Sequence, residues 1–439
     1  MNSKASSDTC RLDAMCGSIS RRNFLRGSGA ALGAGAVSIG FAPQLAAQSA
    51  TSARTLVYIF LRGAMDGLSC VVPIGSGADA QIYRTKRNST RMDASDGNAA
   101  RRPIALPGGL FGLHPAMTGF KELWDMDRLA IVHGCGHLSP ATQTRSHFDA
   151  QEQIELGTPG VQSSITGWLA RHMATTPDLV DSAIFNAIAA GGSPPQSLQG
   201  WSDAVTLSTT GSFHPDTSDT TFARTHLEAL RSMYTGGSDL DVAATAAVGA
   251  VDLVSGIDFN AYVPGGGVTY PDTGIGRSLR LIATLMRRNI GLSVATLDVG
   301  GWDTHNNQGV FEFGGYYNNV RDLSNAVTAF YKDLAGSNFA NRVGIVIQSE
   351  FGRQVTENES QGTDHGLGNP MFVIGGGVNG GMYGEFPGLA SLVGDAVRPT
   401  TDFRQVLATV VDRLMGNDAA EAIFDDPEAP FTYSPMAFA

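Results

Sequence analysis

Short runs of almost wholly apolar residues recur along the chain and are separated by amphipathic or polar stretches. The runs cover 54–61 (RTLVYIFL), 128–132 (RLAIV), 292–299, 343–348 and 371–375 (MFVIG). Uninterrupted apolar runs of this length are typical of strands that are buried on both faces, as in parallel sheets. Because helical stretches separate the runs, we expect an α/β fold, a three-layer sandwich with a mostly parallel central sheet.

Apolar residues at three- and four-residue spacing predict the helices of the outer layers. The expected helices cover 115–125, 146–156, 277–289, 317–335 and 402–415, the last of them capped by Thr400 or Thr401. Residues 73–113 are polar and glycine-rich and are expected to form loops. Residues 158–275 hold helical pieces between stretches rich in Ser, Thr, Gly and Pro, which predicts a large elaboration of the core and no independent domain.

The first 47 residues are interpreted as an export signal. Arg21 and Arg22 lie in a twin-arginine motif (SRRNFLR), and a weakly apolar run, 27–41, and the pair Ala46-Ala47 follow it in the expected order. The run is too short and too rich in glycine to be a stable membrane span. The alternative is a chance Arg-Arg pair before a core helix. We expect the twin-arginine translocase to export the folded protein, so that residues 48–439 form a periplasmic or secreted domain.

Composition narrows the classes of partner. Hydrophobic residues make up 42% of the chain and charged residues 16%, which allows a large core and argues against disorder. The net charge is −11, and residues 1–47 contribute five basic and two acidic side chains, so 48–439 carry about −14. So acidic a domain argues against nucleic acid or an anionic membrane as partner. It still permits an anionic substrate if metal ions supply local positive charge.

Four cysteines occur in the sequence, and two of them, Cys10 and Cys16, belong to the expected export signal. The other two, Cys70 and Cys135, each follow an expected strand by a few residues. An oxidising compartment would allow them to form a disulfide, and free thiols are the alternative.

Acidic residues and histidines follow the expected strands one after another. Asp66 follows the first strand, Ser146, His147 and Asp149 the second, Asp303 and His305 the third, and Glu350 the fourth, with Asp364 and His365 in the next loop. Sites in open α/β sheets lie beyond the carboxyl ends of the strands. Carboxylates together with imidazoles are ligands for divalent metals. The expected metal ligands are Asp66, Asp303, His305, Glu350, Asp364 and His365.

Each of these residues also has a structural interpretation. Asp66 stands in a glycine-flanked stretch and fits a turn. Ser146 fits a helix N-cap, with Asp149 at the third helical position in a variant capping box. The placement of the whole set at successive strand ends favours the metal site.

Five motifs together resemble the bacterial family catalogued as domain of unknown function 1501, many of whose members have twin-arginine leaders. The motifs are RGAMDGL (62–68), RSHFDAQ (145–151), GGWDTH (300–305), SEFGR (349–353) and GTDHG (362–366). That family is grouped with the alkaline phosphatase and sulfatase superfamily. The resemblance implies an alkaline phosphatase-like sandwich that binds one or two divalent ions, with zinc as the first candidate and calcium or magnesium as alternatives.

The resemblance also implies roles for individual residues. Asp66 resembles the metal ligand after the first strand, Asp303 and His305 an Asp–His ligand pair, and His365 the late histidine ligand. Glu350 stands where an Asp commonly binds the other metal. Ser146 occupies the nucleophile region, with His147 beside it, and Arg145 or Arg353 would stabilise charge on the reacting group. The departures from the superfamily pattern are a tighter Asp–His spacing, Phe351 after Glu350, and no sulfatase signature.

The expected activity is therefore metal-dependent hydrolysis of phosphate or sulfate esters in the cell envelope, on a small-molecule or glycan ester, with a serine nucleophile. One alternative is a non-catalytic envelope protein that binds a metal or a glycan. The other is a transferase or mutase of phosphate groups on the same fold.

Overall fold

The structure is a computed structural model that describes residues 54–439 apart from 162–163, 177–184, 208–219, 256, 260 and 338. The expected export signal, residues 1–47, lies outside the described residues. No helix in the described part of the chain has both the length and the apolar character needed to cross a membrane.

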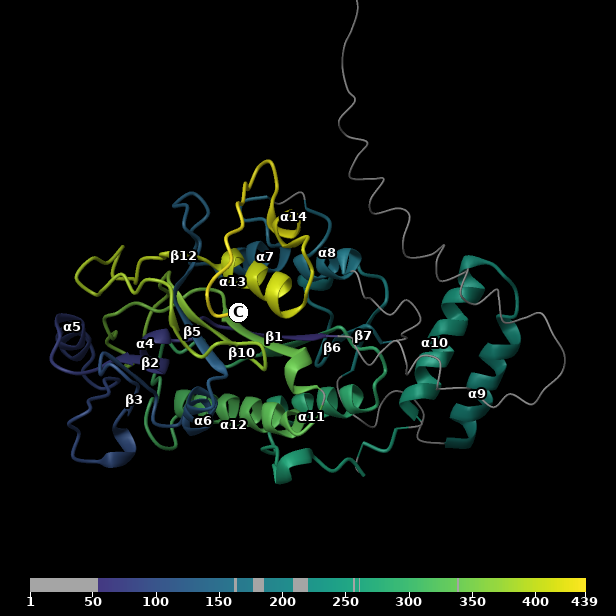
Figure 1. Ribbon diagram of the computed structural model, residues 1–439, viewed down its shortest axis with the longest axis horizontal. Helices are drawn as coiled ribbons and strands as arrows, with labels where there is room; N and C mark the ends of the chain where they lie inside the picture. The colour runs from purple at the N-terminus through teal and green to yellow at the C-terminus, as the bar shows by residue number, and fades with distance from the viewer. Residues whose placement is uncertain are drawn as a thin grey trace, which may run out of the picture.

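A nine-stranded sheet forms the centre of the fold (Figure 1). Its order is β11-β5-β10-β9-β1-β8-β6-β7, and β12 also pairs with β5. The strands are β1 (Thr55–Leu61), β5 (Leu129–Gly136), β6 (Ala187–Ala189), β7 (Ala204–Thr206), β8 (Val294–Val299), β9 (Val343–Ser349), β10 (Asn369–Gly375), β11 (Gly381–Tyr383) and β12 (Thr401–Asp402). Within the described residues, β10 pairs antiparallel with β5 and β9, and the other pairs of this sheet are parallel. The expected mostly parallel sheet is confirmed.

Strand β1 shows why its apolar run is uninterrupted. Its side chains alternate between two hydrophobic cores: Val57, Ile59 and Leu61 lie in one, and Leu56, Tyr58 and Phe60 in the other. Because both cores are closed to solvent, neither face of the strand tolerates polar residues.

Helices cover both faces of the sheet, as expected (Figure 1). One layer contains α6 (Thr118–Asp125), α11 (Gly274–Arg287) and α12 (Gly315–Ala335). The other contains α7 (His147–Leu156), α8 (Trp168–Thr175), α13 (Phe403–Thr409), the π-helical turn Val410–Leu414 and α14 (Ala420–Phe424). The three-layer α/β sandwich predicted from the periodicity is confirmed.

The prediction of loops over 73–113 was wrong in part. This stretch holds α5 (Ala78–Lys86) and most of a small antiparallel sheet. That sheet contains β2 (Val71–Pro73), β4 (Phe111–Leu113) and β3 (Ile104–Ala105), in that order, and β2 follows the short helix α4 (Gly67–Cys70). Strands of two or three residues are too short to show a two-residue period. Helix α5 buries only Ala80 and Tyr83, so its sequence lacks an apolar stripe.

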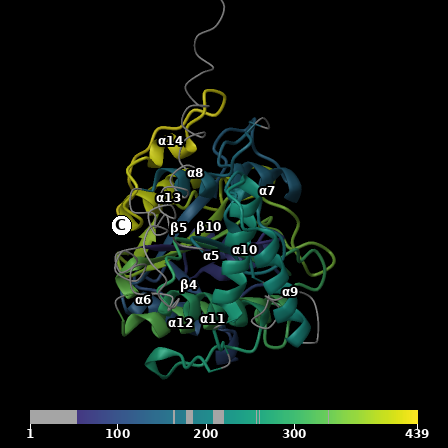
Figure 2. The same cartoon turned by 90° about the vertical axis from the view of Figure 1, so that its right-hand side faces the viewer.

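The segment 158–275 is divided between the core and the side of the molecule. Strands β6 and β7 extend the main sheet beyond β8. Helices α9 (Thr220–Met233) and α10 (Asp239–Ser255) form a hairpin beside the sheet, and Figure 2 views the molecule from the side on which it lies. The described part of this segment therefore holds two strands of the main sheet and a helical hairpin beside the sheet.

The two cysteines of the described chain are free and buried. Cys70 and Cys135 lie in different hydrophobic cores, on opposite faces of the sheet. The disulfide considered from the sequence is therefore not formed. Burial raises the pKa of the Cys70 thiol to about 12, which argues against a thiolate nucleophile.

Candidate metal centre

Three adjacent parallel strands, β8, β1 and β9, end at the same edge of the sheet. The loop after β8 carries Asp303 and His305, and Glu350 follows β9 directly. Strand β10 runs in the opposite direction, so the loop before it brings His365 to this edge. Helix α7 contributes His147, its first residue.

The loops can approach each other closely because Gly63 has no side chain. Its φ is +114°, and an added Cβ atom would lie 2.4 Å from the backbone nitrogen of Asp303. Both the backbone conformation and the space therefore require glycine. The first glycine of RGAMDGL thus allows Asp303 to lie against the end of β1.

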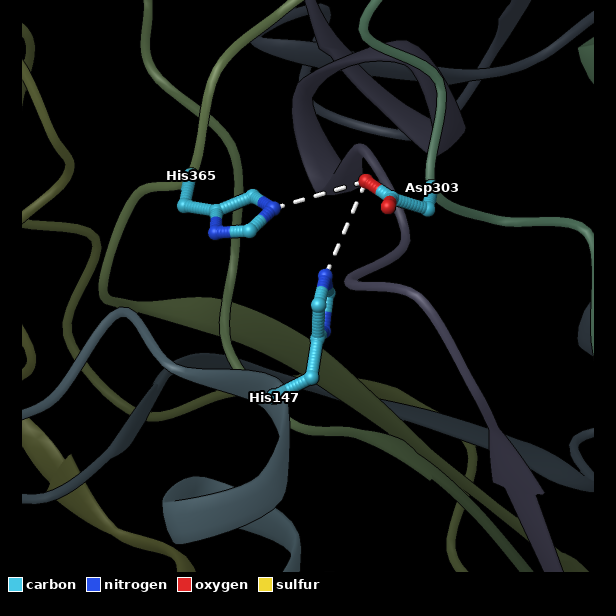
Figure 3. A group of neighbouring side chains, drawn as sticks. All are labelled: His147, Asp303 and His365. Atoms are coloured by element: carbon cyan, nitrogen blue, oxygen red, sulfur yellow. Dashed lines mark hydrogen bonds and ion pairs between the residues drawn. The ribbon is translucent and has the colours of Figure 1, made fainter.

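Three histidine nitrogens gather around one carboxylate oxygen. Asp303 Oδ1 lies 3.1 Å from His305 Nε2, 3.4 Å from His365 Nε2 and 3.6 Å from His147 Nε2. Figure 3 shows His147 and His365 pointing at Asp303 from two sides. Ligands bound tetrahedrally at about 2.0–2.1 Å from a zinc ion lie about 3.3–3.4 Å apart. The ligand atoms of His147, Asp303 and His365 all lie within 4.8 Å of one another, so these three residues have the dimensions of a site for one metal ion, and His305 lies beside them.

An oxygen atom behind each imidazole fixes its orientation. The Nδ1 atoms lie 2.8 Å from Asp364 Oδ1 for His305, 2.7 Å from the Arg145 carbonyl oxygen for His365, and 3.4 Å from Glu350 Oε1 for His147. Carboxylates and carbonyls only accept hydrogen bonds, so in the neutral rings of His305 and His365 Nδ1 carries the hydrogen and Nε2 keeps a lone pair. The contact of His147 with Glu350 is an ion-pair contact, and His147 Nδ1 has no hydrogen-bond partner among the described residues. Histidine ligands in metal sites are held in this way by groups outside the first coordination shell.

The resulting lone pairs point at one another. Nε2 of His305 and Nε2 of His365 are 2.9 Å apart, and a carboxylate oxygen lies beside them. Nε2 of His147 is buried and has no hydrogen-bond partner among the described residues. Two lone pairs at this distance repel each other unless a cation lies between them. One divalent ion would satisfy all three nitrogens and the Asp303 oxygen together, so these residues fit a metal.

The electrostatics of the cluster favour its metal-binding form. Burial alone would raise the pKa of Asp303, but the hydrogen bond and charge of Arg353 and the neighbouring histidines hold that pKa below its ordinary value. Burial lowers the pKa of His365, so its ring is neutral at neutral pH. The contact with Glu350 raises the pKa of His147, against burial. A proton therefore competes with a metal ion more strongly at His147 than at His365.

Glu350 and Asp364, both expected as ligands, lie behind the histidines. The two carboxylate oxygens of Glu350 accept hydrogen bonds from the backbone nitrogens of Gly63 and Ala64, each at 2.8 Å. Asp364 accepts hydrogen bonds from His305 and from Asn358 Nδ2. These two acids therefore lie behind histidine rings, and His147, expected in a catalytic role, points at Asp303 beside the expected ligands.

Asp66 lies in a separate buried cluster. It is 0% exposed, and Arg87 Nη2 donates to Oδ1 at 2.9 Å while Arg87 Nη1 donates to Oδ2. Ser69 Oγ and Gln308 Nε2 also donate to Oδ2, at 2.6 and 2.7 Å. Burial would raise the pKa of Asp66, but Arg87 outweighs it and the pKa is lowered. An internal cation thus already neutralises this carboxylate.

Arg353 is buried below the cluster. Its guanidinium donates to Asp303 Oδ1 at 2.6 Å and to the carbonyl oxygens of Ala64 and Thr363, both at 2.7 Å. It therefore fixes Asp303 and the surrounding loops. Arg145 is exposed, donates to the Gly394 carbonyl at 2.9 Å, and contributes to the cluster through its own carbonyl.

Ser146 is the N-cap of α7, and its Oγ accepts a hydrogen bond from the backbone nitrogen of Asp149 at 3.4 Å. Its position at a helix N-terminus is as expected. A nucleophile would need its hydroxyl turned toward the metal ligands, whereas this hydroxyl faces the first turn of its own helix. The geometry gives Ser146 the capping role.

The family model described as "Protein of unknown function (DUF1501)" matches residues 268–434, which include Asp303, His305, Glu350 and His365. The resemblance predicted from the motifs is confirmed by this match. No curated protein matches the chain.

Several solved structures are similar at low identity. The lipoteichoic acid synthase LtaP from Listeria monocytogenes is 9% identical, covers 84% of this chain and 73% of its own, and has a TM-score of 0.35. The C-terminal periplasmic domain of EcEptC from Escherichia coli, in complex with Zn, is 12% identical. The match covers 88% of this chain and 90% of that domain, with a TM-score of 0.35. A protein in the alkaline phosphatase superfamily from Vibrio parahaemolyticus is 11% identical. The match covers 85% of this chain and 71% of that protein, with a TM-score of 0.31. TM-scores this low do not establish a shared activity.

Proposed function

We propose that this relative of the DUF1501 family is a metal-dependent hydrolase of phosphate or sulfate esters that acts in the cell envelope. The observation that carries the proposal is the set of three imidazole nitrogens and one carboxylate oxygen that converge with their lone pairs inward. A divalent ion at such a site supplies a Lewis acid and lowers the pKa of bound water toward neutrality.

The donor set favours zinc and a single ion. Three nitrogens with one oxygen suit zinc, whereas calcium and magnesium prefer oxygen ligands. The remaining acids are already engaged: Asp66 by Arg87, Glu350 by backbone N–H groups and His147, and Asp364 by His305. A second ion would therefore have to displace an existing partner.

The chain's own residues position the reaction. Arg353 prevents the Asp303 carboxylate from turning away, and the Glu350 carboxylate lies 3.4 Å from His147 Nδ1, where its charge attracts the ring. The cluster is open to a substrate, because the side chains of Asp303 and His305 are 49% and 37% exposed. His147, with its raised pKa, is the group best placed to hold a proton when no ion is bound.

The test is an assay of the zinc-loaded protein on p-nitrophenyl phosphate, bis(p-nitrophenyl) phosphate and p-nitrophenyl sulfate. We expect at least one ester to be hydrolysed, and chelation followed by readdition of zinc to remove and restore the activity. The Ser146→Ala variant should keep its turnover and lose about 0.5–2 kcal/mol of stability, the cost of a lost N-cap. A loss of turnover by several orders of magnitude at unchanged zinc content would instead make Ser146 the nucleophile.

The alternatives predict other outcomes of the same assay. A non-catalytic protein that binds a metal or a glycan would contain zinc and hydrolyse none of the esters. A transferase or mutase would release more p-nitrophenol when alcohol acceptors are added and would form the corresponding new ester.

Export by the twin-arginine route is also proposed, on the motif around Arg21 and Arg22. Replacing both arginines by lysine should leave the precursor in the cytoplasm, because the translocase recognises the arginine pair. Cell fractionation measures the distribution. Normal processing and export of the double variant would rule out this route.

A further inference from the structure

A short loop, residues 358–364, lies against the segment that carries His305. A backbone hydrogen bond from Thr363 N to Thr304 O, at 3.1 Å, joins the two segments directly before His305. The loop comes so close that a Cβ atom added to Gly362 would lie 2.2 Å from the carbonyl oxygen of His305. The loop is therefore in direct contact with the backbone of His305.

Asn358 links this loop to His305 through its side chain. Its amide nitrogen, Nδ2, donates to the carbonyl oxygen of His305 at 2.9 Å. The same nitrogen donates to Asp364 Oδ1 at 3.1 Å. An amide nitrogen carries two hydrogens, so one hydrogen serves each of these bonds. Asn358 therefore holds both the backbone of His305 and the carboxylate behind the His305 ring.

The oxygen of the same amide shapes the loop itself. Asn358 Oδ1 accepts hydrogen bonds from the backbone nitrogens of Ser360 and Gly362, both at 3.0 Å. The position thus requires a side chain with a donor at one end and an acceptor at the other. Asparagine supplies both, whereas an ionised aspartate of the same shape supplies acceptors only.

The Asp364 carboxylate is a mobile kind of group that these contacts fix. Its side chain is 49% exposed, and a side chain in contact with water has several rotamers open to it. Its Oδ1 atom lies 2.8 Å from His305 Nδ1 and also accepts from Asn358, so two donors hold one oxygen in place. With that oxygen fixed, the His305 ring keeps Nε2 directed at Asp303 Oδ1, 3.1 Å away.

We propose that Asn358 is a positioning residue of the metal centre, which acts through His305 and Asp364 and sets the direction of the His305 lone pair. This inference rests on the metal site of the proposed function. Asn358 is not itself a ligand, because both ends of its amide are engaged by the protein. Its replacement leaves every proposed ligand in the chain and changes only how one of them is aimed.

The variant Asn358→Asp tests this role without removing the loop contacts. The new carboxylate keeps an acceptor for Ser360 N and Gly362 N, but its second oxygen faces the His305 carbonyl and the Asp364 carboxylate and repels both. We expect zinc affinity, measured by competition with a chromogenic chelator, to fall by about 10–100-fold, the range for an orienting group. The absorption spectrum of the cobalt-substituted protein should also change, because it reports the coordination geometry.

Asn417→Asp is the matched control, in the loop before α14. Its Nδ2 donates to the His172 carbonyl at 3.2 Å and to Thr175 Oγ1 at 2.9 Å, and its Oδ1 accepts from Ala419 N at 3.1 Å. The amide thus has the same two-ended pattern of contacts, and it is 0% exposed. On the folded protein, this variant should lower stability to urea at least as much as Asn358→Asp. It should keep the zinc affinity and the cobalt spectrum of the wild type.

The outcomes separate this inference from the proposed hydrolase. Wild-type zinc affinity and an unchanged cobalt spectrum in Asn358→Asp would overturn the positioning role and leave the hydrolase standing. An equal loss of zinc affinity in Asn417→Asp would also overturn it, because the effect would then follow stability alone. A selective loss in Asn358→Asp, from a wild type that binds zinc and hydrolyses no ester, would support the positioning role and refute the hydrolase. A wild type that binds no zinc would refute both.

Discussion

Replacing Asp303 by asparagine is expected to empty the metal centre while the protein stays folded. The Oδ1 atom of Asp303 is the common neighbour of His147, His305 and His365, and it supplies the negative charge of the set. Loss of a group that only orients a ligand typically lowers metal affinity by about 10–100-fold. Loss of Asp303, a direct ligand in the proposed site, should lower zinc affinity by more than that. Zinc content after dialysis against a competing chelator measures the effect, and ester hydrolysis should fall in parallel.

Two further variants calibrate that result. Glu350→Gln removes the charge that orients His147 and should weaken zinc binding by about 10–100-fold. His226→Ala, on the exposed surface of α9, should leave zinc content and ester hydrolysis unchanged.

Zinc should be lost as pH falls, because the imidazoles must be neutral to bind. The raised pKa of His147 means that His147 takes up a proton at a higher pH than His365, whose pKa is lowered. Full zinc occupancy in Asp303→Asn would contradict the assigned ligands.

Replacing Arg87 by methionine is expected to destabilise the fold by about 3–5 kcal/mol, because it leaves the buried Asp66 carboxylate without its partner. Both side chains are 0–1% exposed, and the guanidinium also donates to Ser69 Oγ at 3.0 Å and to the Val355 carbonyl at 3.1 Å. Urea unfolding followed by circular dichroism measures the change in the free energy of unfolding.

The double variant Asp66→Leu/Arg87→Met is the control for that prediction. It removes both charges and should recover part of the lost stability, since replacing a buried pair by apolar residues is often neutral. The folded fraction of the single variant should still bind zinc, because Asp66 belongs to a different cluster from Asp303. Loss of zinc from folded Arg87→Met would place Asp66 among the ligands after all.

The strands of the main sheet were predictable because each long strand carries its own apolar run in the sequence. Strand β1 is apolar at every position from Leu56 to Leu61, and both of its faces are buried. Strands β2, β3 and β4 are too short for any period, so their pairing depends on contacts that no local pattern reveals.

The location of the candidate site was predictable, and the binding of a metal there stays a proposal. Asp303, His305 and His365 were expected as ligands and lie together. The division between ligands and orienting acids was not predictable, because it depends on the direction of each side chain. Glu350 is turned toward the backbone nitrogens of Gly63 and Ala64, which lie far from it in the sequence. Asp66 is bound by Arg87, which lies in a polar stretch where no pattern indicated a partner.

The start of α7 decides which side chain faces Asp303. Helix α7 begins with Ser146 as its cap, so the next residue, His147, is the one that projects toward Asp303. The sequence left a cap and a nucleophile as alternatives for Ser146, because a pattern of residues does not give the direction in which a hydroxyl points.

Anomalous scattering at the zinc edge, from crystals of the zinc-loaded protein, tests the metal centre most directly. The prediction is one peak per chain, about 2.0–2.2 Å from His147 Nε2, His305 Nε2, His365 Nε2 and an oxygen of Asp303. Two results would contradict the assignment of these four residues as a metal site. One is no peak at this position, and the other is a peak at Asp66, where the ion would have displaced Arg87 as the partner of that carboxylate.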